Sequence, residues 1–191
     1  MTGITRVSFA HMDDATEEEM QLIRRRVVEH RELHLVDTLL DLLRSGSGHD
    51  FGYQVDRYEH CLQTASRAQR DGAGPDLVVA ALFHDVADDI APDNHSEAAA
   101  AILRPVLDEE SHWVVRHHGI FQAYHYAHLV GGDRDARERF RGNAHFDVTA
   151  HFCAAWDQPA FDPDYDTLPL DAFLPAVREV FGRTPAGWGA A

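Results

Sequence analysis

The stretch Ala-Ala-Leu-Phe-His-Asp-Val-Ala-Asp, residues 80–88, sets a histidine beside an aspartate in what reads as a buried helix. His84 and Asp85 are two strong metal ligands at a place where apolar core residues would be expected. Adjacent helix residues point about 100° apart, so the two side chains cannot share a face. Both can still reach a metal cluster at the helix end, and the two oxygens of the carboxylate can bridge two ions.

Further candidate ligands lie on both sides of this pair. His60 precedes it, His95 and the pair His117-His118 follow it, and Asp157 stands nearer the end of the chain. Four histidines and two carboxylates are enough to hold two metal ions. Nitrogen and oxygen ligands without thiolate suit Fe, Mn, Zn, Co or Ni better than a copper–thiolate or iron–sulfur centre.

Most of the 14 histidines need no functional role, because a single histidine on a helix is usually a surface residue or a satisfied core residue. Eight are interpreted in that way: His11, His30, His34, His49, His112, His128, His145 and His151. Cys61 and Cys153 stand far apart without C-x-x-C spacing, so they indicate neither a disulfide framework nor a zinc ribbon. We expect both to pack as small apolar residues.

The composition bounds the partners and the compartment. The formal net charge of −15 argues against nucleic acid or an anionic membrane surface as the main partner. All 17 basic residues are arginine, which excludes any function that needs a lysine Schiff base, base or phosphate clamp. The longest aliphatic run, residues 77–83, is too short to span a bilayer, and the N-terminus lacks the apolar core of a signal peptide. We expect a cytoplasmic protein without a membrane partner.

The periodicity of apolar residues predicts an all-α protein, since no segment alternates with period two for long enough to form a strand. Capping boxes are predicted at Thr16–Glu19 and Asn94–Glu97. The predicted helices cover residues 16–44, 55–69, 77–87, 95–104, 109–129, 134–141, 146–156 and 170–181. We expect one domain over 1–191, with a leading helix at about 16–44, a metal-binding core at about 51–157 and a C-terminal strap at 158–191.

The long helix predicted at 109–129 carries two neighbouring rows of polar and aromatic side chains. One row holds His118, Gln122 and His125, and the other holds His117, Phe121, Tyr124 and His128. One helix can therefore present a metal ligand and a row that faces the substrate side by side.

The order of the six candidate ligands resembles the HD-domain superfamily of metal-dependent, all-α proteins, over roughly residues 51–157. The closest resemblance is to the diiron oxygenase branch, which includes organophosphonate-cleaving enzymes and, more distantly, myo-inositol oxygenase. Three segments carry it: Tyr58-Glu59-His60-Cys61-Leu62-Gln63, the metal-binding helix at 80–85, and Ala155-Trp156-Asp157.

The resemblance implies a mixed-valent pair of iron ions, one ferrous and one ferric, held by six ligands. Asp85 would bridge the two ions. His60, His84 and Asp157 would map to one iron, and His95 and His118 to the other. His117 is the competing choice for the last histidine.

The chain also departs from that branch. Gln122 stands where the phosphonate enzymes carry a lysine, and Ala154 where they carry an arginine. Val130-Gly131-Gly132 replaces their Gln-Gly-Gly loop, and Phe51-Gly52-Tyr53 occupies the region of their lid. The phosphohydrolase branch often follows His-Asp with Gly-Lys, and here Val86-Ala87 follows instead. The resemblance therefore implies that the metal site is retained and that the residues which bind the phosphonate group are not.

Two chemistries stay open at this point. The first is an oxygenase that oxidises a small hydroxylated or aminated substrate with O₂, in which Gln122, Tyr53 and His117 are the candidates to orient the substrate.

The second is a phosphohydrolase of nucleotides or small phosphate esters, which would use Mn, Co, Ni or other divalent metals. Arg57, Arg67 or Arg116 would then have to supply positive charge near the site. A binding or regulatory protein that has lost catalysis is the third reading, and no ligand position is missing that would favour it.

Overall fold

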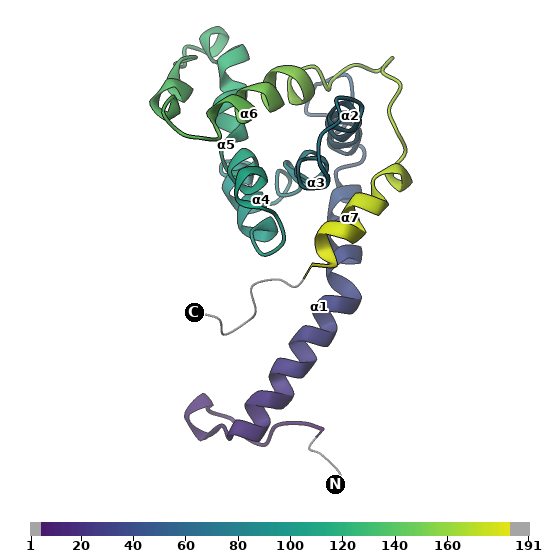
Figure 1. The fold of residues 1–191 in the computed structure, drawn as a ribbon, viewed down its shortest axis with the longest axis vertical. Helices are drawn as coiled ribbons and strands as arrows, with labels where there is room; N and C mark the ends of the chain where they lie inside the picture. The colour runs from purple at the N-terminus through teal and green to yellow at the C-terminus, as the bar shows by residue number, and fades with distance from the viewer. Residues whose placement is uncertain (1–4, 184–191) are drawn as a thin grey trace.

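The structure is a computed structural model that describes residues 5–183. These residues form helices and turns without a strand, so the predicted all-α class is confirmed. The α-helices of this part of the chain are α1 (Glu17–Ser45), α2 (Arg57–Arg70), α3 (Pro75–Phe83), α4 (His95–Leu103), α5 (Glu109–Tyr126), α6 (Phe146–His151) and α7 (Leu174–Phe181) (Figure 1). None of them is both long and apolar enough to cross a membrane.

Helix α3 lies at the centre of the fold, because its sequence is apolar on every face. The side chains of residues 79–83 are completely buried, and α2, α5 and α7 pack around them. Gly74 precedes the helix and Pro75 begins it, where the missing N–H of proline costs no hydrogen bond. The residues that directly follow α3 therefore lie in the middle of the molecule.

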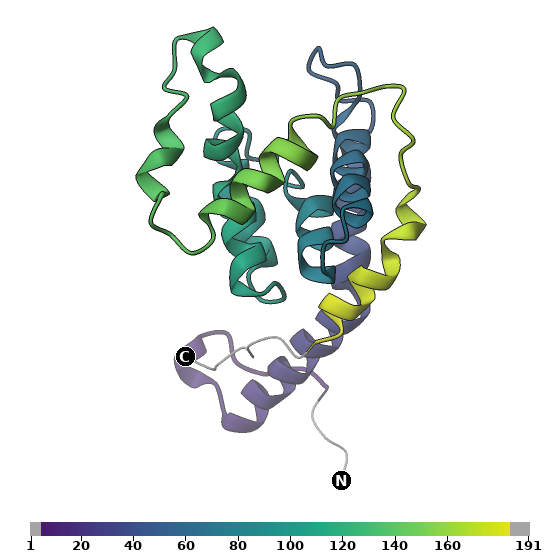
Figure 2. The same cartoon turned by 45° about the horizontal axis from the view of Figure 1, so that its top comes forward.

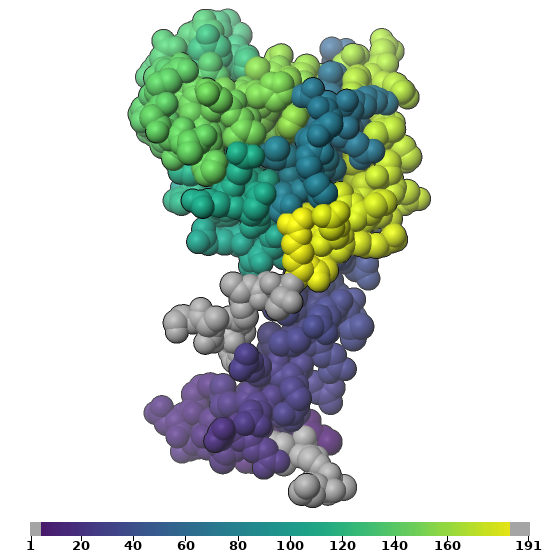
Figure 3. Space-filling view, viewed as in Figure 1, coloured from purple at the N-terminus to yellow at the C-terminus, as the bar shows by residue number. Residues whose placement is uncertain are grey.

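Helix α1 is continuous, and its two halves differ in their surroundings. Its predicted capping box is confirmed: the Thr16 hydroxyl accepts a hydrogen bond from the Glu19 amide, and the Glu19 carboxylate accepts one from the Thr16 amide. The C-terminal half buries Leu39, Leu40 and Leu43 in the core. The N-terminal half projects away from the rest of the molecule (Figures 1 and 3).

Two local predictions were wrong. The helix predicted to reach Ala87 ends at Phe83, and the chain continues in tighter turns with hydrogen bonds such as Val86 N–H to Phe83 O and Asp88 N–H to Asp85 O. Asn94 precedes α4 without a capping bond, because its backbone is not in the extended conformation that places a capping side chain.

The segment from Gln158 to α7 passes along the outside of α2 (Figure 2). The guanidinium of Arg67 donates to the Pro159 carbonyl at 2.9 Å and lies 3.9 Å from the centre of the Tyr165 ring. Arg70 pairs with Asp166 at 2.9 Å. Helix α7 then packs on α3, so the segment returns the chain to the core.

Candidate metal centre

His60 and His84 meet at the centre of the helical body. His60 lies in the first turn of α2, which is capped by Asp56: the Asp56 carboxylate accepts the Glu59 amide at 2.8 Å. His84 directly follows α3. Both side chains are buried, and their Nε2 atoms lie 3.2 Å apart.

Asp157 contacts the same two histidines from a different part of the chain, the turn that follows α6. Helix α6 continues into a π-helical turn, η4 (Phe152–Asp157), and Asp157 is its last residue. Its Oδ1 atom lies 3.4 Å from His60 Nε2 and 3.7 Å from His84 Nε2. Single π-helical turns are frequent at functional sites, where the wider turn redirects a side chain.

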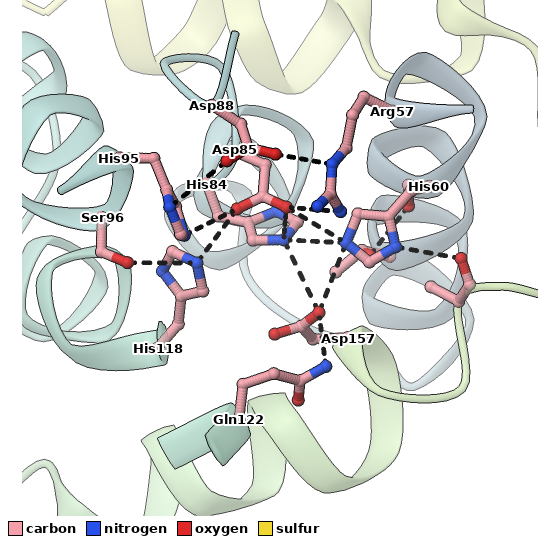
Figure 4. Close-up of polar contacts among 12 residues, drawn as sticks. Arg57, His60, His84, Asp85, Asp88, His95, Ser96, His118, Gln122 and Asp157 are labelled. Carbon is pink, nitrogen blue, oxygen red and sulfur yellow. Dashed lines mark hydrogen bonds and ion pairs between the residues drawn. The ribbon is translucent and has the colours of Figure 1, made fainter. Parts of the chain in front are cut away.

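Asp85 lies between two groups of histidines (Figure 4). Its Oδ2 atom faces His60 Nε2 at 3.4 Å and His84 Nε2 at 3.5 Å. Its Oδ1 atom faces His95 Nε2 at 3.4 Å and His118 Nε2 at 3.1 Å. The four histidines and two carboxylates thus form two neighbouring ligand groups that share one carboxylate.

All four histidines turn the same ring atom toward the centre. Each donates its Nδ1–H to a backbone carbonyl, which leaves Nε2 directed at the carboxylates. The bonds are His60 to Ala160 (3.0 Å), His84 to Ala81 (2.9 Å), His95 to Pro92 (3.2 Å) and His118 to Val115 (2.7 Å). Such bonds fix the tautomer of a metal-binding histidine.

The charges of the cluster attract positive charge to its middle. Burial lowers the pKa of His60, but the carboxylates of Asp157 and Asp85 raise it to about 9. Burial raises the pKa of Asp85, yet the neighbouring His84 and His118 hold it well below its usual range. Burial likewise raises the pKa of Asp157, and His60 and His84 again outweigh it and lower that pKa.

The donor set fits divalent metal ions. The groups His60–His84–Asp157 and His84–Asp85–His118 each bring their ligand atoms within 4.8 Å of one another. Asp157 Oδ2 is buried and has no hydrogen-bond partner among residues 5–183, which is costly unless a cation or another polar group satisfies it. Imidazole nitrogens and carboxylate oxygens are ligands for Fe, Mn, Zn, Co and Ni.

A comparison with protein-family models agrees with this geometry. The model of the HD domain matches residues 57–158, which is more than half of the chain and includes all six ligand candidates. The chain belongs to the HD domain family. No curated protein matches the sequence. HD domains are metal-dependent enzymes that include phosphohydrolases and oxygenases, and the buried histidine–aspartate cluster of this HD domain suits divalent ions.

A pocket of about 350 Å³ opens beside the cluster of this HD domain. Its lining residues are Tyr53, Arg57, His60, Asp85, His95, His118, Gly119, Gln122, His125, Tyr126, Asp157, Gln158 and Phe161. Two of the predicted substrate-facing residues are among them. Gln122 Nε2 donates to Asp157 Oδ1 at 3.2 Å, and the Tyr53 ring stacks on Phe161 at 4.5 Å.

His117, the third residue predicted to face the substrate and the alternative ligand, lies outside this pocket. Its ring stacks on Trp113 at 3.8 Å and donates Nδ1–H to the Trp113 carbonyl. One position along α5 turns a side chain by about 100°, so only His118 of the pair reaches Asp85.

Three residues of the site were missed or misjudged by the sequence reasoning. Phe161 stacks on His60 at 4.4 Å, and no local pattern marks a residue so far along the chain. Asp88 contacts both Arg57 and His95, and its spacing of one turn from Asp85 was the available signal. The sequence suggests Arg57 as a source of positive charge for a phosphate, but its guanidinium lies against the carboxylates of Asp85 and Asp88.

Proposed function

We propose that this HD-domain protein is an oxygenase that uses two iron ions, one ferrous and one ferric, to oxidise a small hydroxylated or aminated substrate with O₂. The proposal is supported by the resemblance of its ligand segments to the diiron oxygenase branch. One observation favours the oxygenase over the phosphohydrolase: the arginine side chains near the pocket are not free to bind a phosphate.

A phosphate ester needs cationic side chains that are free to bind it. Among the described residues that line the pocket, Arg57 is the one with a guanidinium, and it is already held by Asp88 at 2.6 Å and by Asp85 at 3.5 Å. Arg67 lies against Tyr165 outside the pocket, and Arg116 is exposed on α5. The three arginines that a phosphohydrolase would have needed are therefore paired or elsewhere.

The remaining pocket wall is neutral and aromatic. Gln122, Gln158 and Tyr126 offer hydrogen bonds without charge. Burial and the nearby Arg137 lower the pKa of His125, so its imidazole stays neutral near pH 7. A volume of about 350 Å³ lies at the small end of ligand sites, so the wall fits a small substrate.

The chain's own residues would prepare the reaction. Bound ions would supply a Lewis-acidic position for a hydroxyl or amine and the redox chemistry toward O₂. Asp85 would join the two ligand groups, and Gln122 would orient Asp157 through its 3.2 Å hydrogen bond. The stacked rings of Tyr53 and Phe161 cover His60 and exclude water from that side.

Metal analysis combined with EPR spectroscopy of aerobically purified protein tests the proposal. We expect about two iron atoms per chain and the signal of two magnetically interacting irons, one ferrous and one ferric. Manganese, cobalt or nickel in their place, together with turnover of nitrophenyl phosphate, would contradict the oxygenase and support the phosphohydrolase. Iron without any perturbation of its EPR signal by small amino alcohols or hydroxy acids would contradict the proposed substrate class.

A further inference from the structure

Asp88 is a buried carboxylate that connects two parts of the metal centre without belonging to either ligand group. It lies in the turns after α3, three residues beyond Asp85, and only 8% of it is exposed. Its Oδ2 atom lies 2.6 Å from Arg57 Nε, and its Oδ1 atom lies 3.4 Å from His95 Nδ1 (Figure 4). One side chain thus contacts both the start of α2 and the start of α4.

His95 is the histidine of the centre with the weakest support from the fold. Its side chain is 26% exposed, whereas those of His60, His84 and His118 are at most 3% exposed. It is the first residue of α4, a helix without a side-chain cap. Its carbonyl partner, Pro92, lies in the same turn and therefore does not tie the ring to the body of the protein.

Arg57 holds Asp88 in place for this contact. Its side chain is only 20% exposed, and its guanidinium lies 5.5 Å from the Phe51 ring centre and 5.4 Å from that of Tyr53. A guanidinium fixed between aromatic rings gives the carboxylate a rigid, charged partner. Asp88 therefore holds a fixed negative charge 3.4 Å from His95 Nδ1, beside the Pro92 carbonyl that accepts the Nδ1–H.

We propose that Asp88 is a positioning residue that orients His95 and so controls the affinity of the ion shared by His95, His118 and Asp85. A carboxylate beside the far nitrogen of a metal-binding histidine fixes its ring and makes it more basic, and the loss of such a partner costs about 10–100-fold in metal affinity. The inference rests on the two-ion centre of the proposed function. It depends neither on iron nor on O₂, because it concerns the protein side of the centre.

The test counts ions and measures their affinities in metal-free protein titrated with Mn²⁺, with free Mn²⁺ followed by EPR. Wild-type protein is expected to bind two ions. Asp88→Ala is expected to bind the first ion with unchanged affinity and the second about 10–100-fold more weakly. Asp88→Asn keeps a carbonyl acceptor for His95 but loses the charge facing Arg57, so its second affinity should lie between the two.

Asp89→Asn is the matched control, because Asp89 is the neighbouring carboxylate and also pairs with a histidine, His49, at 2.9 Å. It should bind both ions as wild type does. Two wild-type affinities in Asp88→Ala, or an equal loss of both ions, would overturn the positioning role. If Asp88→Ala does not fold, the same two outcomes apply to Asp88→Asn.

These results separate the inference from the proposed function. Two Mn²⁺ ions in wild type and a selectively weakened second ion in Asp88→Ala would support the role of Asp88 even if the purified protein contains no iron. Fewer than two ions in wild type would overturn both.

Discussion

Removing Asp85 should abolish both metal positions, whereas removing Asp157 should abolish only one. The reason is geometric, because Asp85 faces all four histidine Nε2 atoms at 3.1–3.5 Å and Asp157 faces only those of His60 and His84. Asp85→Ala and Asp157→Ala remove the same side chain at two positions, and we expect the first variant to bind no metal ion and the second to bind one.

The magnitude follows from linkage between binding and folding. An ion present at 100 times its dissociation constant stabilises the folded protein by about 2.7 kcal/mol, so two ions contribute about 5 kcal/mol. For a chain of this size each kcal/mol raises the Tm by roughly 2–4 °C. Saturating metal should therefore raise the Tm of wild type by about 10–20 °C, that of Asp157→Ala by about half as much, and that of Asp85→Ala hardly at all.

Differential scanning calorimetry of each variant with and without Mn²⁺ measures these shifts. Comparing each variant with its own metal-free form removes the intrinsic cost of the truncation. Asp166→Ala is a suitable control, since this carboxylate is exposed and its one ion pair within residues 5–183 is with Arg70. A metal-induced shift in Asp85→Ala as large as that in Asp157→Ala would refute the idea that Asp85 is shared.

Two further predictions concern α5 and α1. His117→Ala should keep two ions per chain and His118→Ala should lose one, as metal analysis would show; loss of an ion from His117→Ala would reverse the ligand assignment. Hydrogen bonds from Ser8 and Thr16 lower the pKa of Glu19 to about 2, below its ordinary value of 4.5. Its contribution to stability is therefore full above pH 4.5 and lost toward pH 2, so Glu19→Gln should destabilise at pH 7 and less at pH 3 in urea unfolding. An equal difference at both pH values would contradict this.

The parts of the site that the sequence predicts well are those with short-range signals. The apolar run before His84 predicts a buried helix, and the helix that begins at Pro75 is the most buried of the fold. The capping box at Thr16 depends on four consecutive residues and is confirmed. The HD family match agrees with the order of the ligands along the chain, because that order can be read from the sequence without knowing the tertiary contacts.

The parts that the sequence could not predict depend on contacts between distant residues. The Nδ1–H of His60 is bound by the carbonyl of Ala160, 100 residues further on, and Phe161 covers the same ring. The chain changes to tighter turns after Phe83, and apolar periodicity does not report such a change of turn type. The resemblance favours His118 over His117, but which of the two faces Asp85 depends on the rotation of α5, which its packing decides.

The most direct test of the two-ion centre is anomalous X-ray diffraction from crystals of the metal-loaded protein. We expect two anomalous peaks, one on each side of the Asp85 carboxylate, with His60, His84 and Asp157 around one and His95 and His118 around the other. A single peak, or peaks away from Asp85, would contradict it.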